Sequence, residues 1–275
     1  MKIKLILAVL VCVSFTVSAQ LSSDLTVVKQ SEATPVKNQA NTGTCWSFST
    51  TSLIESTTMK DGKGEFDLSE MYTVRAVYTE KAKNYILRQG SAQFGPGGLG
   101  HDVIRSIENY GAMPEGAYSG LLLGVKNHDH LKLDAQLKNY LDSLLKKRPV
   151  PADWMVGFQG ILDEHLGKAP ETFVYKEKTY TPQTFAKEVL KFKAEDYVAI
   201  TSFSHHPFYQ PFILEVPDNF LNGSYYNLPL NEMIALTERA VQSGYSVMWD
   251  ADVSNRYFNQ NAGYAIQWEG SERPK

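Results

Sequence analysis

The chain has 275 residues, of which 43% are hydrophobic, 21% are charged and 12% are aromatic, and its formal net charge is −3 at pH 7. This composition is that of a globular protein with enough residues for one large domain or two small ones, and it argues against a disordered chain. The slightly acidic balance gives no basic surplus of the kind that binds nucleic acid.

The first twenty residues, MKIKLILAVLVCVSFTVSAQ, have the three-part layout of a signal peptide. Lys2 and Lys4 form a short basic start, residues 5–17 are almost wholly apolar, and small residues follow up to Ala19. The apolar run is shorter than the roughly 20 residues that a membrane-spanning helix needs, which disfavours an anchor. We therefore expect cleavage after Ala19 and a secreted or periplasmic protein without a membrane attachment.

The chain has two cysteines, and the first, Cys12, lies inside this leader. Lipid attachment at Cys12 is disfavoured because Val11 before it is not small. With residues 1–19 removed as a signal peptide, Cys45 would stand alone, so no intramolecular disulfide is expected. Cys45 is then either a buried cysteine that packs as a small hydrophobe or a reactive nucleophile.

The segment around Cys45, TPVKNQANTGTCWSFSTTSLIES at residues 34–56, favours the nucleophile. Pro, Asn and Gly before Cys45 indicate a loop, whereas neither Gly nor Pro occurs after it until Gly62, which indicates a helix. A helix start offers unpaired N–H groups and a partial positive charge, which stabilise a thiolate and can bind the oxyanion of a tetrahedral intermediate. Gln39, six residues earlier, can supply a second oxyanion donor.

At this point the segment resembles a known family. Five residues stand at the intervals of the nucleophile segment of papain-like cysteine peptidases: Gln39, Gly43, Cys45, Trp46 and Phe48. The usual local form there is Cys-Gly-Ser/Ala-Cys-Trp/Tyr, and residues 42–46 read TGTCW. Thr42 thus replaces a cysteine that normally forms a disulfide, which is similar to the bleomycin hydrolase and aminopeptidase C branch of the family.

Two further stretches agree with this resemblance. LSEMY at residues 68–72 resembles the start of the family's second helix, and residues 95–118 resemble its Gly-Gly segment followed by a helix. Gly97 and Gly98 have no Cβ, so a substrate chain can pair closely with their backbone. We expect the helix to run from about His101 to Gly111.

The middle of the chain predicts a helical block at residues 119–195, which is longer than the connection in a simple papain. Its first helix carries leucines at helical spacing, its second begins at Asp153 as a cap, and its third begins at Thr181-Pro182. Segments of this block and of residues 240–254 also resemble the bleomycin hydrolase branch.

The C-terminal part predicts strands and one helix. Residues 197–203 and 245–249 are rich in strand formers, Asn222-Gly223 suggests a hairpin turn, and Asn231 can cap a helix that reaches Ser243. The resemblance therefore implies an α+β, papain-like fold. It has a helical left-hand domain at 20–118, a helical insertion at 119–195, and the start of an incomplete right-hand antiparallel β domain at 196–275.

A cysteine peptidase needs a base, and in this family a late histidine followed by Ala or Gly plays that role, oriented by an Asn before Ser-Trp. The chain has six histidines and none has this context: His101, His128, His130, His165, His205 and His206. We expect His128 and His130 to be solvated in a polar loop, and His165 to lie near a helix C-terminus. His205 and His206 are the best candidates within the chain, with His101 next, but the expectation is that the base and its Asn lie beyond Lys275.

The resemblance implies a peptidase in which Cys45 is the nucleophile, Gln39 and the Cys45 N–H bind the oxyanion, and Gly97, Gly98 and Trp46 line the substrate site. Removal of N-terminal residues is implied by the branch, and endopeptidase action stays open. No metal or other cofactor is expected, the partner is a peptide substrate, and the oligomeric state is left open. The alternative is a catalytically inactive relative that binds peptides.

Overall fold

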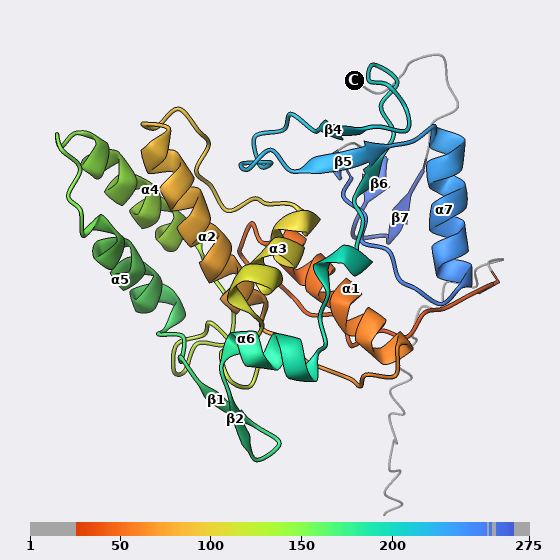
Figure 1. Ribbon diagram of the computed structural model, residues 1–275, viewed down its shortest axis with the longest axis horizontal. Helices are drawn as coiled ribbons and strands as arrows, with labels where there is room; N and C mark the ends of the chain where they lie inside the picture. Colours follow the sequence, from red (N-terminus) through yellow and green to blue (C-terminus); the bar gives the residue numbers. More distant parts are fainter. Residues whose placement is uncertain (1–25, 252, 255–256, 267–275) are drawn as a thin grey trace, which may run out of the picture.

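Most of the longer helices and the three-stranded sheet occupy different parts of the molecule, as Figure 1 shows for the computed structural model. The structure describes residues 26–251, 253–254 and 257–266, so the predicted signal peptide lies outside the described residues. Five longer helices gather on one side, and the three-stranded sheet lies with one further helix on the other. The fold is α+β, as the sequence predicted.

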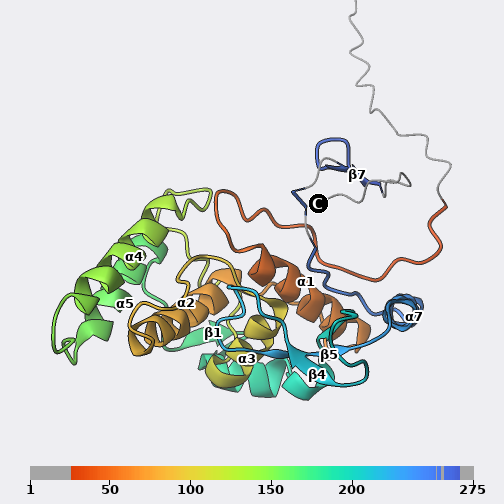
Figure 2. The same cartoon turned by 90° about the horizontal axis from the view of Figure 1, so that it is seen from above.

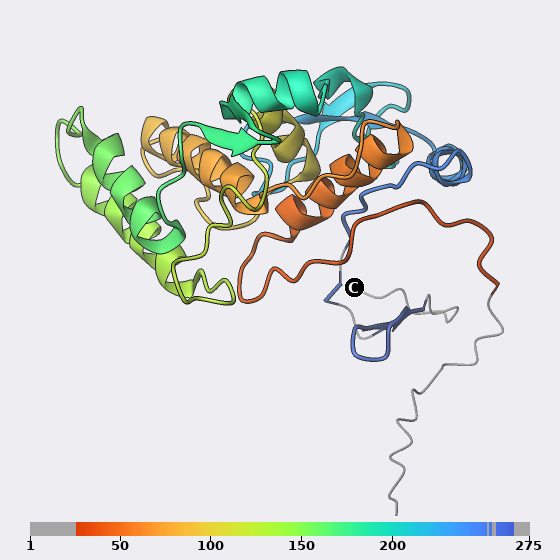
Figure 3. The same ribbon diagram turned by 90° about the horizontal axis from the view of Figure 1, so that it is seen from below.

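Three helices form the centre of the helical part: α1 (Cys45–Lys60), α2 (Glu70–Leu87) and α3 (Gly100–Tyr110). Helices α4 (Leu131–Leu145) and α5 (Trp154–Leu166) pack against each other and on α2, away from the three-stranded sheet. Figure 2 and Figure 3 show from two further sides that this pair stays at the end of the molecule opposite the last helix. All five helices contribute side chains to one buried apolar core, including Ile54, Val77, Val103, Leu137 and Phe158.

Local signals explain where these helices begin and end. The Ser69 hydroxyl accepts a hydrogen bond of 3.1 Å from the N–H of Tyr72, which caps the start of α2. Gly111 ends α3 with φ = +84°, a conformation that favours glycine. Asp153 precedes α5 as predicted, but its side chain makes no capping hydrogen bond, so that part of the prediction is wrong.

A short connection leads from the helices to the sheet. Strands β1 (Phe173–Tyr175) and β2 (Lys178–Tyr180) form an antiparallel hairpin. The predicted third helix follows as α6 (Pro182–Thr184), which continues into a π-helical turn at Phe185–Val189, and a 3₁₀ turn covers Ala194–Asp196. The Thr181 hydroxyl accepts from the N–H of Thr184 and caps this helix.

The sheet has the order β3-β5-β4, with β3 at Ile200–Thr201, β4 at Pro211–Ile213 and β5 at Ser224–Asn227. Strand β4 is antiparallel to β5, but β3 is parallel to it, so the predicted purely antiparallel pairing is wrong for β3. Helix α7 (Leu230–Gln242) follows β5 and precedes a small antiparallel pair, β6 (Phe258–Asn259) and β7 (Tyr264–Ala265).

Three local expectations differ from the structure. Residues 245–249 form no strand, because no described segment pairs with them. Helix α7 begins at Leu230 after Pro229, so Asn231 lies inside it and does not cap it. Asn222 and Gly223 do lie between antiparallel strands, but they close the longer loop 214–223 and are no two-residue turn.

Among the described residues, no helix is both long enough and apolar enough to cross a membrane. The predicted domain boundaries at residues 118 and 195 stay a prediction.

Candidate active site

Cys45 is the first residue of α1 and its side chain is exposed, as expected for a nucleophile and not for a packed core cysteine. The carbonyl of Thr44 accepts from the N–H groups of Ser47, at 2.9 Å, and Phe48, at 3.3 Å. The N–H groups of Cys45 and Trp46 have no partner within the part of the chain that the structure describes. Two backbone donors are therefore free at the helix start, where an oxyanion would be stabilised.

Lys37 fixes the loop that leads to Cys45. Its Nζ lies 3.0 Å from a Glu55 carboxylate oxygen, 2.7 Å from Asp67 and 3.0 Å from Glu70. Burial opposes the charge, but the three carboxylates outweigh it and raise the pKa of Lys37. The loop is thereby tied to both α1 and α2, which was not predicted from the sequence.

Gln39 sits in this loop three residues before Thr42. Its Nε2 donates a hydrogen bond of 2.6 Å to the Thr42 carbonyl, and the Thr42 hydroxyl lies 3.1 Å from the Gln39 carbonyl. A primary amide has two N–H groups, so one donor of Gln39 stays available beside the nucleophile segment.

Trp46 joins the nucleophile segment to the Gly-Gly segment. Its indole is only 2% exposed, and Nε1 donates to the Pro96 carbonyl at 2.9 Å. A Cβ on Gly98 would come within 2.8 Å of the Trp46 ring, and one on Gly43 within 2.6 Å of Pro96. These glycines are therefore needed for close packing, and Gly98 lies against Trp46, the residue that follows Cys45.

Gly97 faces the strand part of the molecule. A side chain at this position would overlap the carboxylate of Asp218, with the Asp218 Cγ only 2.6 Å from the added Cβ. Asp218 also accepts a hydrogen bond of 3.2 Å from Gln93 Nε2. The loop 214–223 thus reaches over the Gly-Gly segment, a contact for which the sequence gives no direct signal.

Lys81 is the other residue that sequence reasoning missed. It lies on α2, is 1% exposed, and donates from Nζ to the carbonyls of Gly95 and Gly97. The sequence did indicate that Lys81 is buried, because it continues the helical spacing of the buried residues Val74, Val77 and Tyr78.

No histidine of the described residues is hydrogen-bonded to the Cys45 thiol. His205 packs against Phe203, and His206 stacks on Phe212 with ring centroids 4.2 Å apart. His101 is the second residue of α3 and lies edge-on to Tyr225, with its ring beside Gly223. Burial lowers the pKa of His101.

The other histidines are structural. His165 lies in the last turn of α5, as predicted, and contacts Gln136. The prediction that His130 is solvated is wrong, because it is 2% exposed and burial lowers its pKa to about 4. A backbone bridge between Asn41 and Asp129 draws this polar loop onto the nucleophile loop.

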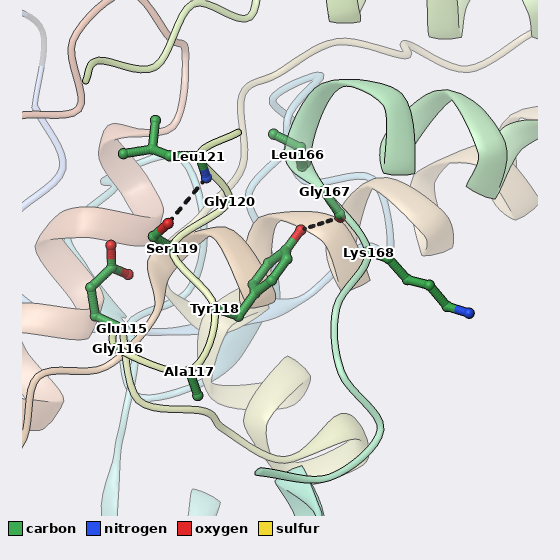
Figure 4. A pocket seen from close by; sticks show the side chains of 10 residues that line it. All are labelled: Glu115, Gly116, Ala117, Tyr118, Ser119, Gly120, Leu121, Leu166, Gly167 and Lys168. Carbon is green, nitrogen blue, oxygen red and sulfur yellow. Dashed lines mark hydrogen bonds between the residues drawn. The ribbon is translucent and has the colours of Figure 1, made fainter. Parts of the chain in front are cut away.

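A separate hollow of about 240 Å³ is lined by residues 115–121 and 166–168 (Figure 4). The Tyr118 hydroxyl donates to the Gly167 carbonyl across it, at 3.2 Å. None of the predicted site residues lines it. In the described part of the chain, no cluster of three or more His, Cys, Asp or Glu side chains has an arrangement that could hold a metal ion.

Comparisons with known proteins agree with the geometry. Residues 21–121 match the model of the papain family cysteine proteases, and residues 165–267 match that of a peptidase C1-like family. A solved structure of PepW from Lactobacillus rhamnosis superposes with a TM-score of 0.62 at 20% identity, over 80% of this chain and 59% of that one, which shows a shared fold. The fold, the nucleophile segment and the two family matches together show that the chain is similar to papain-like cysteine peptidases.

Its relatives indicate the branch. The chain is 25% identical to the bleomycin hydrolase of Gallus gallus over 83% of its length, and 23% identical to that of Homo sapiens over 84%. It is 24% identical to aminopeptidase W of Lactobacillus delbrueckii subsp. lactis over 83%. The chain spans 61% of the length of each of these three proteins. The chain is thus similar to proteins of the bleomycin hydrolase and aminopeptidase type.

Proposed function

We propose that this chain supplies the nucleophile and the substrate-binding backbone of a secreted cysteine peptidase that removes residues from the N-termini of peptides. One observation carries the proposal: Cys45 is exposed at the start of α1, beside two backbone N–H groups that have no partner among the described residues. The family matches support peptide hydrolysis, and the relatives called bleomycin hydrolase and aminopeptidase W support the exopeptidase type.

The chemistry follows from this arrangement. The Cys45 thiolate attacks the substrate carbonyl carbon, and the carbonyl oxygen becomes an oxyanion that accepts from the Cys45 N–H and the free N–H of Gln39. Collapse of this intermediate expels the amine, which takes a proton from the general acid, and leaves a thioester on Cys45. Water then hydrolyses the thioester and regenerates the thiol.

We also propose that none of the six histidines in these 275 residues is the base. His205 packs edge-on against Phe203, and His206 stacks on Phe212. His128 lies edge-on to the buried His130, and His165 contacts Gln136. His101 lies beside Gly223 and edge-on to Tyr225, and it has no hydrogen bond to Cys45 among the described residues. The base would then come from outside these residues.

A peptide-binding relative without catalysis is the second candidate. The observation that favours it is that no described histidine bonds to Cys45. Such a protein would bind peptides at Gly98 in the same way but would form no thioester. Measuring peptide hydrolysis therefore distinguishes it from the peptidase.

Secretion rests on the N-terminal pattern alone. N-terminal sequencing of the exported protein is expected to begin at Gln20, and a chain that keeps Met1 in the cytoplasm would contradict it.

The test of the function uses the protein purified from the cells that make it. Fluorogenic peptides with a free N-terminus are expected to be hydrolysed faster than the same peptides with an acetylated N-terminus. Cys45→Ala is expected to abolish hydrolysis without unfolding the protein, because the side chain is exposed and packs little. Ser52→Ala on the same helix serves as the control. Undiminished turnover by Cys45→Ala would rule out the proposal.

A further inference from the structure

Lys81 is a buried cation that the mechanism above does not use. It is 1% exposed on the inner face of α2, and its Nζ donates hydrogen bonds of 2.8 Å to the Gly95 carbonyl and 2.5 Å to the Gly97 carbonyl. The Phe220 ring lies 5.7 Å from the ammonium group, so segment 218–220 covers it from the strand side. One lysine thereby joins a helix of the central core to the segment predicted to bind substrate.

Burying this charge is costly. Desolvation lowers the pKa of Lys81, and the negative charges of Asp218, Asp102 and Asp134 only partly oppose that shift. An apolar residue of similar volume is often as stable or more stable at such a site. Stability alone is therefore a poor explanation for a lysine at this position.

The geometry of one peptide bond suggests what the lysine does. The carbonyl of Gly97 belongs to the same peptide unit as the N–H of Gly98, and in a planar trans peptide the two groups point in opposite directions. Since the carbonyl points at Lys81, the N–H points away from it. Gly98 is buried, yet neither its N–H nor its carbonyl has a partner among the described residues. Buried backbone groups are almost always paired, so the partner of Gly98 is expected to be a strand or ligand outside the described residues.

Gly98 is also next to the nucleophile. A Cβ at Gly98 would touch the Trp46 indole, and Trp46 follows Cys45 directly. A peptide backbone paired with Gly98 would therefore run past the start of α1.

We propose that Lys81 is a positioning residue that binds the Gly97 carbonyl and thereby directs and polarises the Gly98 N–H for pairing with the backbone of a peptide substrate. A hydrogen bond to the carbonyl end of a peptide unit strengthens donation by its N–H end. The inference rests on the proposed function, because it concerns the same site. It adds a residue that touches neither the substrate nor Cys45.

The test compares two reagents with the same electrophile. Iodoacetamide alkylates Cys45 without backbone pairing, whereas an iodoacetylated dipeptide can also pair with Gly98. The rates are measured at Cys45 by peptide mass spectrometry in the 275-residue chain. In Lys81→Met, the rate with the dipeptide reagent is expected to fall by at least about tenfold, the scale of a lost hydrogen bond to a charged group. The rate with iodoacetamide should stay within about twofold, because the thiolate itself is unchanged.

Two variants control the comparison. Lys83→Met, on the exposed face of the same helix, is expected to change neither rate. Lys81→Arg keeps the charge and two donors, and it should restore the dipeptide rate to within about threefold of wild type. If Lys81→Met does not fold, Lys81→Gln replaces it, with an expected loss of at least about threefold because an amide donor is neutral.

The outcomes separate the two claims. An equal fall with both reagents would mean that Lys81 only supports the fold, and no fall with either would mean that Gly98 does not depend on it. Each result overturns the inference while leaving the proposed function standing. If wild-type Cys45 reacts no faster with the dipeptide reagent than with iodoacetamide, the substrate site at Gly98 is wrong, and the inference is wrong with it.

Discussion

At the scale of single residues, the candidate site depends on backbone groups as much as on side chains. The N–H groups of Cys45 and Trp46 have no partner among the described residues because α1 begins there, and the Thr44 carbonyl accepts from Ser47 and Phe48. Gln39 adds a side-chain donor whose position is fixed by its bond to Thr42. In the proposed function these groups bind the oxyanion, and donors that are already in place would need no reorganisation during the reaction.

Removing one oxyanion donor should therefore affect the transition state and not the thiol. Gln39→Ala is expected to lower turnover of the native protein by about 10²–10³, the usual cost of such a donor. Alkylation of Cys45 by iodoacetamide is expected to be nearly unchanged, since that reaction forms no oxyanion. Matching losses in the two assays would show that Gln39 supports the loop instead.

The residues of the papain-like motif were predictable from the sequence. The roles of the two lysines that position this motif were not. Cys45, Gln39, Trp46 and the glycines stand at a recognisable spacing. Lys37 looks like a surface lysine in the sequence, and only helical spacing marks Lys81 as buried. The carboxylates and carbonyls that bind these two lysines come from other segments of the chain. His130 was also misjudged, because its N–H donates to the carbonyl of Asn41 in a distant segment while the rest of its loop stays largely exposed.

At the scale of elements, the helices were predictable where a cap or a glycine marks them, as at Ser69, Gly111 and Thr181. Strands were harder, because a strand exists only where another segment pairs with it. Residues 245–249 have strand-forming side chains, but no described segment pairs with them as a strand. Of residues 197–203, only two pair with β5.

The connection after α3 contains Glu115, whose surroundings disfavour ionisation of its carboxyl group. Glu115 donates its N–H to the Asp67 carbonyl at 2.8 Å, which holds the connection against the start of α2. Burial, followed by the charges of Glu70 and Asp67, raises the pKa of Glu115 from 4.5 to about 7, and its Oε2 has no partner among the described groups.

A raised pKa in the folded state makes ionisation destabilising. The stability that Glu115 contributes in its protonated form is fully present below about pH 4.5 and is lost as the pH rises through about 7. The free energy of unfolding of wild type is therefore expected to fall across this window relative to that of Glu115→Gln, which cannot ionise. Urea unfolding of both at either end of the window measures this, with exposed Glu108→Gln on α3 as the control. A constant difference between wild type and Glu115→Gln would refute it.

At the scale of the whole molecule, the helical part forms one core around α1, α2 and α3, and the short sheet meets it through Asp218 and Phe220. The α+β class was predictable from the order of helical and strand-rich segments. The parallel pairing of β3 with β5 was not, because pairing direction depends on contacts between residues far apart in sequence. The chain covers 61% of the curated relatives, so the activity of the protein as a whole stays a proposal.

The most direct test is the pH dependence of Cys45 alkylation in the 275-residue chain, because it asks whether the nucleophile has its base within these residues. Alkylation by iodoacetamide is expected to be slow at about pH 5 and to rise with pH, since the thiolate is the reactive form and no described histidine is bonded to it. His101→Ala, His205→Ala and His206→Ala are expected to leave this profile unchanged. Rapid alkylation at about pH 5 that one of these substitutions abolishes would show a thiolate–imidazolium pair inside the chain, and would contradict the assignment of the base to residues outside it.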